Sequence, residues 1–318
     1  MPAIHLRPAE PDRDFAQLAV FFTILEDWPN TAQSLKAYYE RERERITQVV
    51  AVDETHDVLG FYWATRDGIV PERVTFDLYV RPERRGEGVG RELYDAMLEA
   101  LAPAQIKVLH VSVWDNCPQG RAFADRRGFA ELRHRIAMAL DLRTFDDGPY
   151  DEILARLGRE GFRFTSMGEL GDTEEAQRNL YRLNDATGRD IPGTAGEPSW
   201  TSFEDFRQSV CAADWYKPDG QMVVIDTATG AWVAMSAITR PEGAAFAYNL
   251  HTGVDRAYRG RKLAQAVKVR ALRYARDVLG IDEVRTHHTV QNLPMIAIDR
   301  KLGYVRRPGT YLMTKTLA

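Results

Sequence analysis

Residues 81–93 read RPERRGEGVGREL, and this stretch places three glycines within five positions between a β-rich run and a helical one. Gly86, Gly88 and Gly90 contribute no side chain and cost backbone entropy on folding. Glycines just before a helix let unpaired N–H groups converge on an anion, because the helix N-terminus also carries partial positive charge. The stretch therefore predicts a loop at which a ligand, most often a phosphate, closely approaches the main chain.

Other signatures of phosphate-binding loops do not fit this stretch. A Walker loop requires G-x-x-x-x-G-K-[ST], which is absent. The dinucleotide fingerprint requires G-x-G-x-x-G, whereas this loop reads G-x-G-x-G, is followed by Arg91 and comes after a third or fourth strand. The remaining alternative to a phosphate site is a plain glycine-rich turn.

The surroundings of the loop recur later in the chain. LYVRPERRGEGVGREL at 78–93 has a partner, TGVDRAYRGRKLAQAV, at 252–267. Three pairs of landmarks keep separations of 174 to 176 residues: Arg85 and Arg259, Asn116 and Asn292, Gly128 and Gly303. Three matches in the same order predict duplication of a whole domain, with domains at 1–145 and 161–318. Residues 146–160 are interpreted as a linker and a connecting helix whose apolar side, Ile153, Leu154 and Leu157, is buried.

Composition limits the class of protein. The 318 residues carry a net charge of −4 and 44% hydrophobic residues, which argues against a nucleic-acid footprint and for an ordinary globular chain. The two cysteines, Cys117 and Cys211, are too few for a disulfide framework, and no Cys/His cluster has the spacing of a zinc site, so no metal is expected. The start lacks the apolar region of a signal peptide, and no apolar run is long enough to span a membrane. These features predict a cytoplasmic protein without nucleic-acid or membrane partners.

The glycine motif and its flanks resemble a known family. Arg85-x-x-Gly88-x-Gly90 follows a strand ending in YVRP, and a strand ending at Asn116 and a helix ending in RGF come next. This set resembles the GNAT family of acyl-CoA-dependent N-acyltransferases, once in each half and over nearly the whole chain. The tandem order is similar in architecture to that of the mycothiol synthases. In the second half, Lys262 and Ala264 stand where the two motif glycines would be.

The resemblance implies an α/β (α+β) fold of two GNAT-like lobes. Each lobe would be a mixed, mostly antiparallel sheet with a splayed parallel strand pair, flanked by helices, and residues 81–106 and 255–282 supply the crossovers that parallel pairs need. Acetyl-CoA would lie in the splay, with its pyrophosphate on the loop. The implied cofactor-binding residues are Leu78, Tyr79, Val80, Arg85, Gly86, Glu87, Gly88, Val89, Gly90 and Asn116, and in the second half Thr252, Gly253, Val254, Arg259, Gly260, Arg261, Lys262, Leu263, Ala264 and Asn292.

The resemblance indicates the catalytic residues less directly than the cofactor-binding residues. Members of the family often carry a carboxylate on the fourth strand, but the residue at that position is Val74 in the first half and Tyr248 in the second. They often carry a tyrosine near the final helix, where this chain has Ala124 in the first half and Asp299 in the second. Asp77 and His251 occupy equivalent positions in the two halves and could serve as bases. His287 and His288 lie on the strand that ends at Asn292, one on each face, and are either bases or satisfied polar residues of a sheet. The candidates are Tyr248, His251, His288 and Asp77.

These observations predict an N-acetyltransferase that moves an acetyl group from acetyl-CoA to a primary amine, expected to be that of a small molecule. Two alternatives remain: acetylation of a protein N-terminus or lysine, and an acyl-CoA-binding sensor module without turnover. We expect a monomer or a homodimer. The first lobe, which keeps Gly88 and Gly90, is expected to bind CoA more tightly, because a Cβ at Lys262 is unfavourable if its φ is positive. The second lobe is expected to bind CoA more weakly. Which lobe carries out catalysis stays open, because Tyr248, His251, His287 and His288 are expected to cluster around the second splay.

Overall fold

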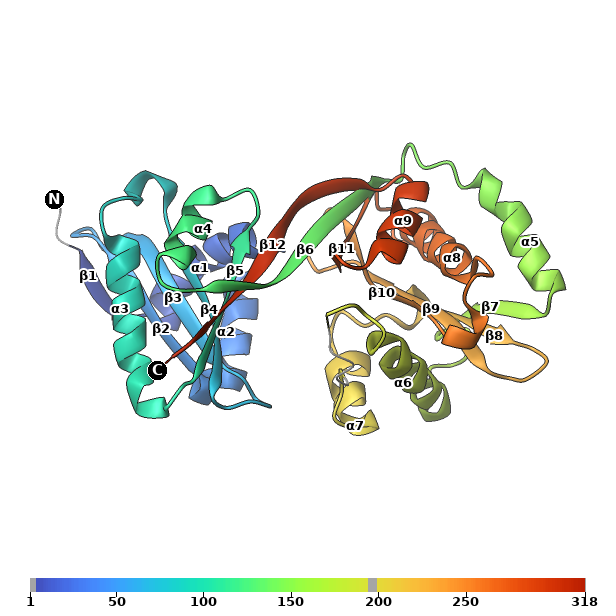
Figure 1. Ribbon diagram of the computed structural model, residues 1–318, viewed down its shortest axis with the longest axis horizontal. Helices are drawn as coiled ribbons and strands as arrows, with labels where there is room; N and C mark the ends of the chain where they lie inside the picture. The colour runs from blue at the N-terminus through green and yellow to red at the C-terminus, as the bar shows by residue number, and fades with distance from the viewer. Residues whose placement is uncertain (1–3, 194–198, 318) are drawn as a thin grey trace. The chain divides into compact units, whose positions relative to one another are not determined.

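The computed structural model describes residues 4–193 and 199–317 and divides into two compact units (Figure 1). Unit 1 comprises Met1–His134 with Thr310–Ala318, and unit 2 comprises Arg135–Gly309. Each unit is a mixed sheet with helices packed against it. The predicted fold class is therefore confirmed.

The sheet of unit 1 has the strand order β1-β2-β3-β4-β5-β12 and is covered on both faces. Its strands are β1 (His5–Pro8), β2 (Ile46–Val52), β3 (Val58–Arg66), β4 (Arg73–Val80), β5 (Val108–Trp114) and the last part of β12 (Val305–Thr316). Its helices are α1 (Pro11–Glu26), α2 (Ala32–Glu42), α3 (Val89–Leu101) and α4 (Pro118–Asp125). Alternate residues of β3 face α1 and α2 (Phe61, Trp63) or α3 (Tyr62, Ala64), which explains its nearly continuous apolar sequence.

Unit 2 repeats this plan with the strand order β6-β11-β10-β9-β8-β7. Its strands are β7 (Phe162–Ser166), β8 (Gln221–Asp226), β9 (Trp232–Thr239), β10 (Ala247–Val254), β11 (Glu283–Thr289) and the last part of β6 (Ala130–Asp141). Its helices are α5 (Asp151–Arg159), α6 (Glu174–Gly188), α7 (Phe203–Phe206), α8 (Leu263–Asp277) and α9 (Leu293–Lys301). The long helix α8 packs its apolar side, including Val267, Ala271 and Leu272, into the core of this unit.

The two strands that close the sequence halves are exchanged between the units. β12 ends the second half, yet its residues Thr310–Thr316 pair antiparallel with β5 of unit 1 (Figure 1). β6 ends the first half, yet from Arg135 onward it pairs antiparallel with β11 of unit 2. The predicted boundaries, 1–145 and 161–318, had placed each closing strand in its own half, whereas the compact units exchange them. The repeat explains the difference, because two equivalent strands can satisfy either of two equivalent sheet edges.

One parallel strand pair in each unit separates along its length. β4 and β5 are paired only from Arg73↔Val108 to Phe76↔Val111, although β4 continues to Val80. β10 and β11 are paired only at Ala247↔Val284 and Tyr248↔Arg285, although β10 continues to Val254. The predicted splay is therefore present in both units: beyond these pairs, β4 and β10 have no strand partner on that side in the described part of the chain.

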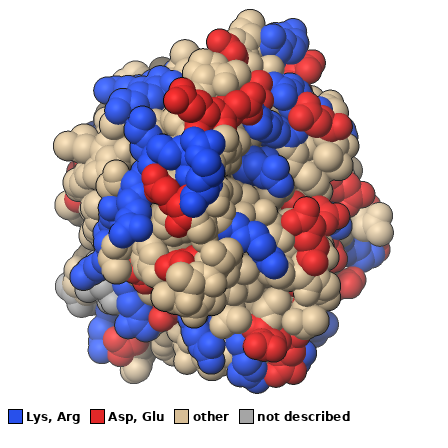
Figure 2. All heavy atoms as spheres, turned by 90° about the vertical axis from the view of Figure 1, so that its right-hand side faces the viewer, with Lys and Arg blue, Asp and Glu red and all other residues tan. Residues whose placement is uncertain are grey.

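The connecting helix α5 belongs to unit 2. Leu157 is fully buried there, and Ile153 and Leu154 pack against the same core. Asp147, which precedes the helix, pairs with Arg276 of α8 at 2.9 Å. On the face of unit 2 that Figure 2 presents, positive and negative side chains are intermixed, in keeping with local pairs such as Arg156 and Glu160.

None of the helices in the described part of the chain combines the length and the hydropathy that crossing a bilayer requires.

Candidate active site

The glycine loop of unit 1 leads directly into α3. Gly86 and Gly88 have φ of 87° and 94°, in the left-handed region, and Gly88 is the N-cap residue. Gly90 lies in the first helical turn, where a Cβ would meet Phe123, Val80 and Leu78 at 3.4–3.7 Å. Arg85 Nε donates to the Val80 carbonyl at 3.1 Å, which ties the loop to the end of β4. The loop thus presents the N-terminal N–H groups of α3 without a side chain over them.

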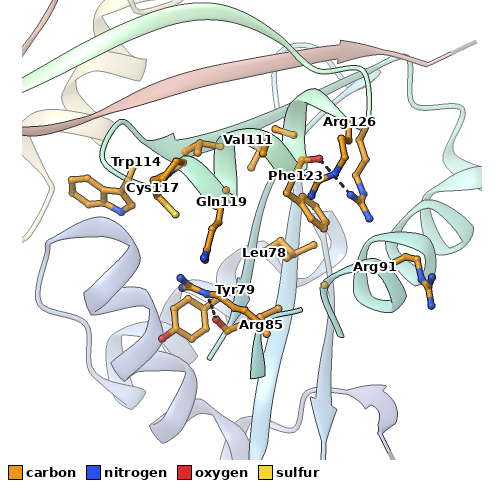
Figure 3. A pocket seen from close by; sticks show the side chains of 18 of the residues that line it. Leu78, Tyr79, Arg85, Arg91, Val111, Trp114, Cys117, Gln119, Phe123 and Arg126 are labelled. Atoms are coloured by element: carbon orange, nitrogen blue, oxygen red, sulfur yellow. Dashed lines mark hydrogen bonds between the residues drawn. The ribbon is translucent and has the colours of Figure 1, made fainter. Parts of the chain in front are cut away.

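A cavity of about 910 Å³ lies beside this loop, between β4, β5, α3 and α4, with α1 at one edge (Figure 3). Five arginines are among its lining residues: Arg84, Arg85, Arg91, Arg126 and Arg127. The rest of the lining is mainly apolar, including Leu78, Val111 and Phe123, and Gln119 extends from α4 toward Arg85 (Figure 3). A cavity of this size, with apolar walls and a few polar groups, is typical of a small-molecule or cofactor site.

The structure places most of the cofactor residues expected in the first half around this cavity. Leu78, Tyr79, Val80, Arg85, Gly86, Gly88 and Gly90 line it. Glu87 instead pairs with Arg84 at 2.8 Å, Val89 is buried in the core, and Asn116 is not among the lining residues. Two further lining residues, Arg126 and Arg127, were not predicted from the sequence. Their place in the sequence could have indicated them, because they stand directly before Gly128, a landmark of the repeat, at the end of the helix that comes after the splayed strands.

Asp77 lies on β4 opposite Trp63 of β3, and Trp63 packs against α1 and α2. Asp77 is not among the residues that line the cavity. Burial and the nearby carboxylate of Glu26 raise the pKa of Asp77 to about 7. Glu26 is the last residue of α1 and accepts a hydrogen bond from Asn30 Nδ2 at 2.9 Å; desolvation raises its pKa as well. Among the described residues, no side chain donates a hydrogen bond to Asp77. A carboxyl group that ionises near neutral pH can accept a proton from an incoming nucleophile.

The second loop has nearly the same backbone as the first. Gly260 and Lys262 have φ of 82° and 70°, and Lys262 is the N-cap residue of α8, as Gly88 is of α3. Arg259 Nε donates to the Val254 carbonyl at 3.0 Å, which repeats the contact of Arg85. The φ of Lys262 is therefore positive, the conformation in which a Cβ at this position is unfavourable. It costs about 1–2 kcal/mol relative to a right-handed residue.

A smaller cavity, of about 410 Å³, lies beside the second loop. Most of the cofactor residues expected in this half line it: Thr252, Gly253, Val254, Arg259, Gly260, Lys262, Leu263, Ala264 and Asn292. Arg261 does not, and its guanidinium lies over the Tyr258 ring at 5.5 Å. Asp190 lines this cavity as well and pairs with Arg259, a contact that the sequence did not indicate.

The imidazoles expected near the second splay are held by different partners. The Tyr248 hydroxyl is hydrogen-bonded to His287 Nδ1. His251 Nε2 is 2.9 Å from Thr187 Oγ1 of α6. Burial lowers the pKa of His251 to about 4 and that of His287 to about 3, so both rings are neutral at pH 7. None of these three residues, Tyr248, His251 and His287, is among those that line the smaller cavity.

His288 lies on the opposite face of β11 from His287. Its Nε2 is 2.6 Å from Asp299 Oδ2, and Asp299 in turn pairs with Lys268 of α8. The side chains of Asp299 and Lys268 are completely buried. The structure therefore joins His288 to an ion pair in the core and does not bring it next to Tyr248 or His251.

Comparison with known proteins identifies relatives of both halves. The family model described as "Acetyltransferase (GNAT) family" matches residues 14–129 and 180–304. A mycothiol acetyltransferase of Corynebacterium aurimucosum is 24% identical over 299 residues, which is 82% of this chain and 91% of the relative.

Solved structures resemble the chain over nearly its whole length. A GCN5-related N-acetyltransferase from Sphaerobacter thermophilus aligns with a TM-score of 0.70 at 17% identity, covering 98% of this chain and 95% of that one. A tandem GNAT protein from the clavulanic acid biosynthesis pathway aligns with a TM-score of 0.72 at 18% identity, covering 99% and 98%. At these identities the structural similarity concerns the fold.

Proposed function

The chain belongs to the GNAT family of acetyltransferases and is an acyltransferase, and from this we propose that unit 1 transfers an acetyl group from acetyl-CoA to a primary amine of a small molecule. The observation that carries the proposal is the 910 Å³ cavity of unit 1. It joins an anion-accepting loop, an unpaired strand edge and an apolar channel in one continuous space. The name of the curated relative, a mycothiol acetyltransferase, supports a small-molecule acceptor.

The residues around the cavity fit CoA in shape and in charge. The N–H groups that follow Gly86 and Gly88 would hold the pyrophosphate at the N-terminus of α3. Arg85, Arg91, Arg126 and Arg127 would supply the compensating positive charge, whereas Arg84 is paired with Glu87. The free edge of β4 at Leu78–Val80 would pair with the pantetheine amides as an added strand does. When bound, acetyl-CoA supplies an acetyl group that is activated as a thioester.

Acyl transfer to an amine needs the amine in its neutral form. Asp77 lies at the splay, next to lining residues but not itself lining the cavity, and in its ionised form it would accept the proton of the ammonium group through a water molecule. The pKa of Asp77, about 7, is far closer to the working pH than that of an ordinary aspartate. The splayed end of β4 can donate a main-chain N–H to the carbonyl oxygen on which negative charge develops.

The proposal is tested by following free thiol release from acetyl-CoA with a panel of small amines and amine-bearing peptides. We expect at least one small amine to accelerate the release well above the rate of thioester hydrolysis. A peptide that accelerates release while no small amine does so would favour acetylation of a protein N-terminus or lysine. Binding of acetyl-CoA without acceleration by any amine would contradict the proposal and favour a sensor module.

A further inference from the structure

The cavity of unit 2 contains an anion that belongs to the chain itself. Asp190 follows the end of α6, and its carboxylate faces the second loop with 12% of the side chain exposed. Arg256 Nε donates to both carboxylate oxygens, at 2.9 and 3.0 Å, and the Nη2 groups of Arg256 and Arg259 also pair with them. One carboxylate thus occupies two guanidinium groups beside the N-terminus of α8 and offsets half of their combined charge.

Unit 1 shows the same loop without this carboxylate. Arg85 is the counterpart of Arg259 and makes the same main-chain contact, through Nε to the end of the preceding strand. Among the described residues, no Asp or Glu lies within ion-pair distance of Arg85. The guanidinium of Arg85 therefore remains available to a ligand, whereas that of Arg259 is already used.

The end of α6 is held over the second splay at two points. Thr187 is hydrogen-bonded to His251 of β10, and a Cβ at Gly253 would collide with the Thr187 side chain. Asp190 then anchors the following residues to Arg256 and Arg259. Thr187, Asp190, Ile191 and Pro192 all line the cavity, so this segment forms one of its walls. The difference in volume, about 410 against 910 Å³, agrees with this arrangement.

We propose that unit 2 contains a latent site for the diphosphate of CoA, closed by Asp190, so that the chain binds one CoA in unit 1 and gains a second site when the Asp190 charge is removed. The inference rests on the proposed function only in taking CoA as the ligand of these loops. A phosphate and the Asp190 carboxylate compete for the same two guanidinium groups, and the carboxylate has the advantage of being attached to the same unit. Without it, Arg256, Arg259 and Lys262 present three positive charges around the N–H groups of α8.

The test is calorimetric titration of CoA into the full-length chain. We expect one CoA per chain for the wild type and two for Asp190→Asn, with Asp190→Ala as a second opening variant. Asp185→Asn is the matched control, because Asp185 also lies near the end of α6 and pairs with an arginine, Arg189, but does not line the cavity. This control is expected to bind one CoA.

Blocking variants assign each binding event to a unit. Gly88→Trp is expected to remove the wild-type event, and Asp190→Asn combined with Gly88→Trp to retain one event. Asp190→Asn combined with Ala264→Trp is expected to return to one event. Circular dichroism and thermal unfolding of each variant confirm that it is folded.

The outcomes separate this inference from the proposed function. Two CoA molecules on the wild type, or a wild-type event that survives Gly88→Trp and is lost in Ala264→Trp, would overturn the closed second site. A single event in both opening variants would overturn the latent site. If the wild type binds no CoA, the proposed function fails, and binding to Asp190→Asn combined with Gly88→Trp still decides the inference.

Discussion

Asp77 is a single residue whose chemistry is set by its neighbours in space. It follows Phe76 at the last paired position of β4, where the strand begins to separate from β5. Burial and then the charge of Glu26 raise its pKa, so the folded chain binds a proton on this group that an unfolded chain releases near pH 4. Since the native state binds more protons between about pH 4 and 7, this group makes folding less favourable as pH rises through that range.

The pH profile of the reaction tests this role. We expect kcat/KM for the amine to rise through an inflection near pH 7, as Asp77 loses its proton. Asp77→Asn is expected to lower kcat by about 10²–10⁴-fold and to remove that inflection, while CoA still binds. Glu26→Gln is expected to move the inflection to lower pH, because it removes the negative charge that disfavours ionisation. Glu99→Gln, an exposed change on α3, serves as the control. An unchanged profile in Asp77→Asn would assign the base elsewhere.

At the scale of elements, α8, α9 and β11 are joined by one buried polar cluster. Lys268 of α8 and Asp299 of α9 form an ion pair without solvent exposure, and His288 of β11 binds the second oxygen of Asp299. Although desolvation opposes it, contact with Lys268 and His288 holds the pKa of Asp299 below its usual range. The stabilising contribution of this carboxylate is therefore present at neutral pH and is lost as pH falls through its native pKa. His288 thus has a structural partner that accounts for its position.

Breaking this pair is expected to be costly. Asp299→Ala leaves the Lys268 ammonium buried without its partner and should lower the free energy of unfolding by about 3–5 kcal/mol. The double variant Lys268→Met, Asp299→Leu should recover most of that loss, because it removes both charges and keeps the volume. Urea unfolding at pH 7 measures both. As a control, Lys107→Ala removes the exposed pair with Glu72 and should cost about 1 kcal/mol or less. Equal losses for Asp299→Ala and Lys107→Ala would show that the buried pair has no special role.

At the scale of the whole molecule, each compact unit is built from both halves of the sequence. β12 pairs with β5 from Thr310↔Trp114 to Thr316↔Val108, and β6 pairs with β11 from Arg135↔Thr289 to Asp141↔Glu283. The chain thus passes between units within two strands and not within the predicted linker. A break in residues 143–147 leaves both of these ladders intact.

Cleavage at an engineered protease site in residues 143–147 is therefore expected to leave the two fragments associated. The nicked protein should elute from size exclusion at the position of the intact chain, and the fragments should separate only in denaturant. Thermal unfolding of the nicked protein reports whether the units remain folded. Rapid release of two stable halves from the nicked protein under native conditions would show that the exchanged strands do not hold the fragments together.

The sequence by itself determined the features that depend on neighbours along the chain. The repeat, the glycine loop before α3 and its counterpart before α8 were predicted from the residues, because turn geometry and strand-to-helix order are local. The splayed strand pairs were implied by the resemblance to the family. Most of the residues expected around the loops do line the two cavities for the same reason, since they are consecutive in a strand, a loop and a helix start. Their roles in cofactor binding and catalysis remain predictions.

Only the tertiary structure decided what depends on partners far apart in the sequence. The closing strands β6 and β12 follow equivalent motifs, so the order of elements could not show which sheet edge each one would join. The pKa of Asp77 depends on Glu26 of another element, and the contact of Asp190 with Arg256 and Arg259 joins two segments that no motif connects. In each case the outcome depends on a pairing or on burial that exists only once distant segments have packed together.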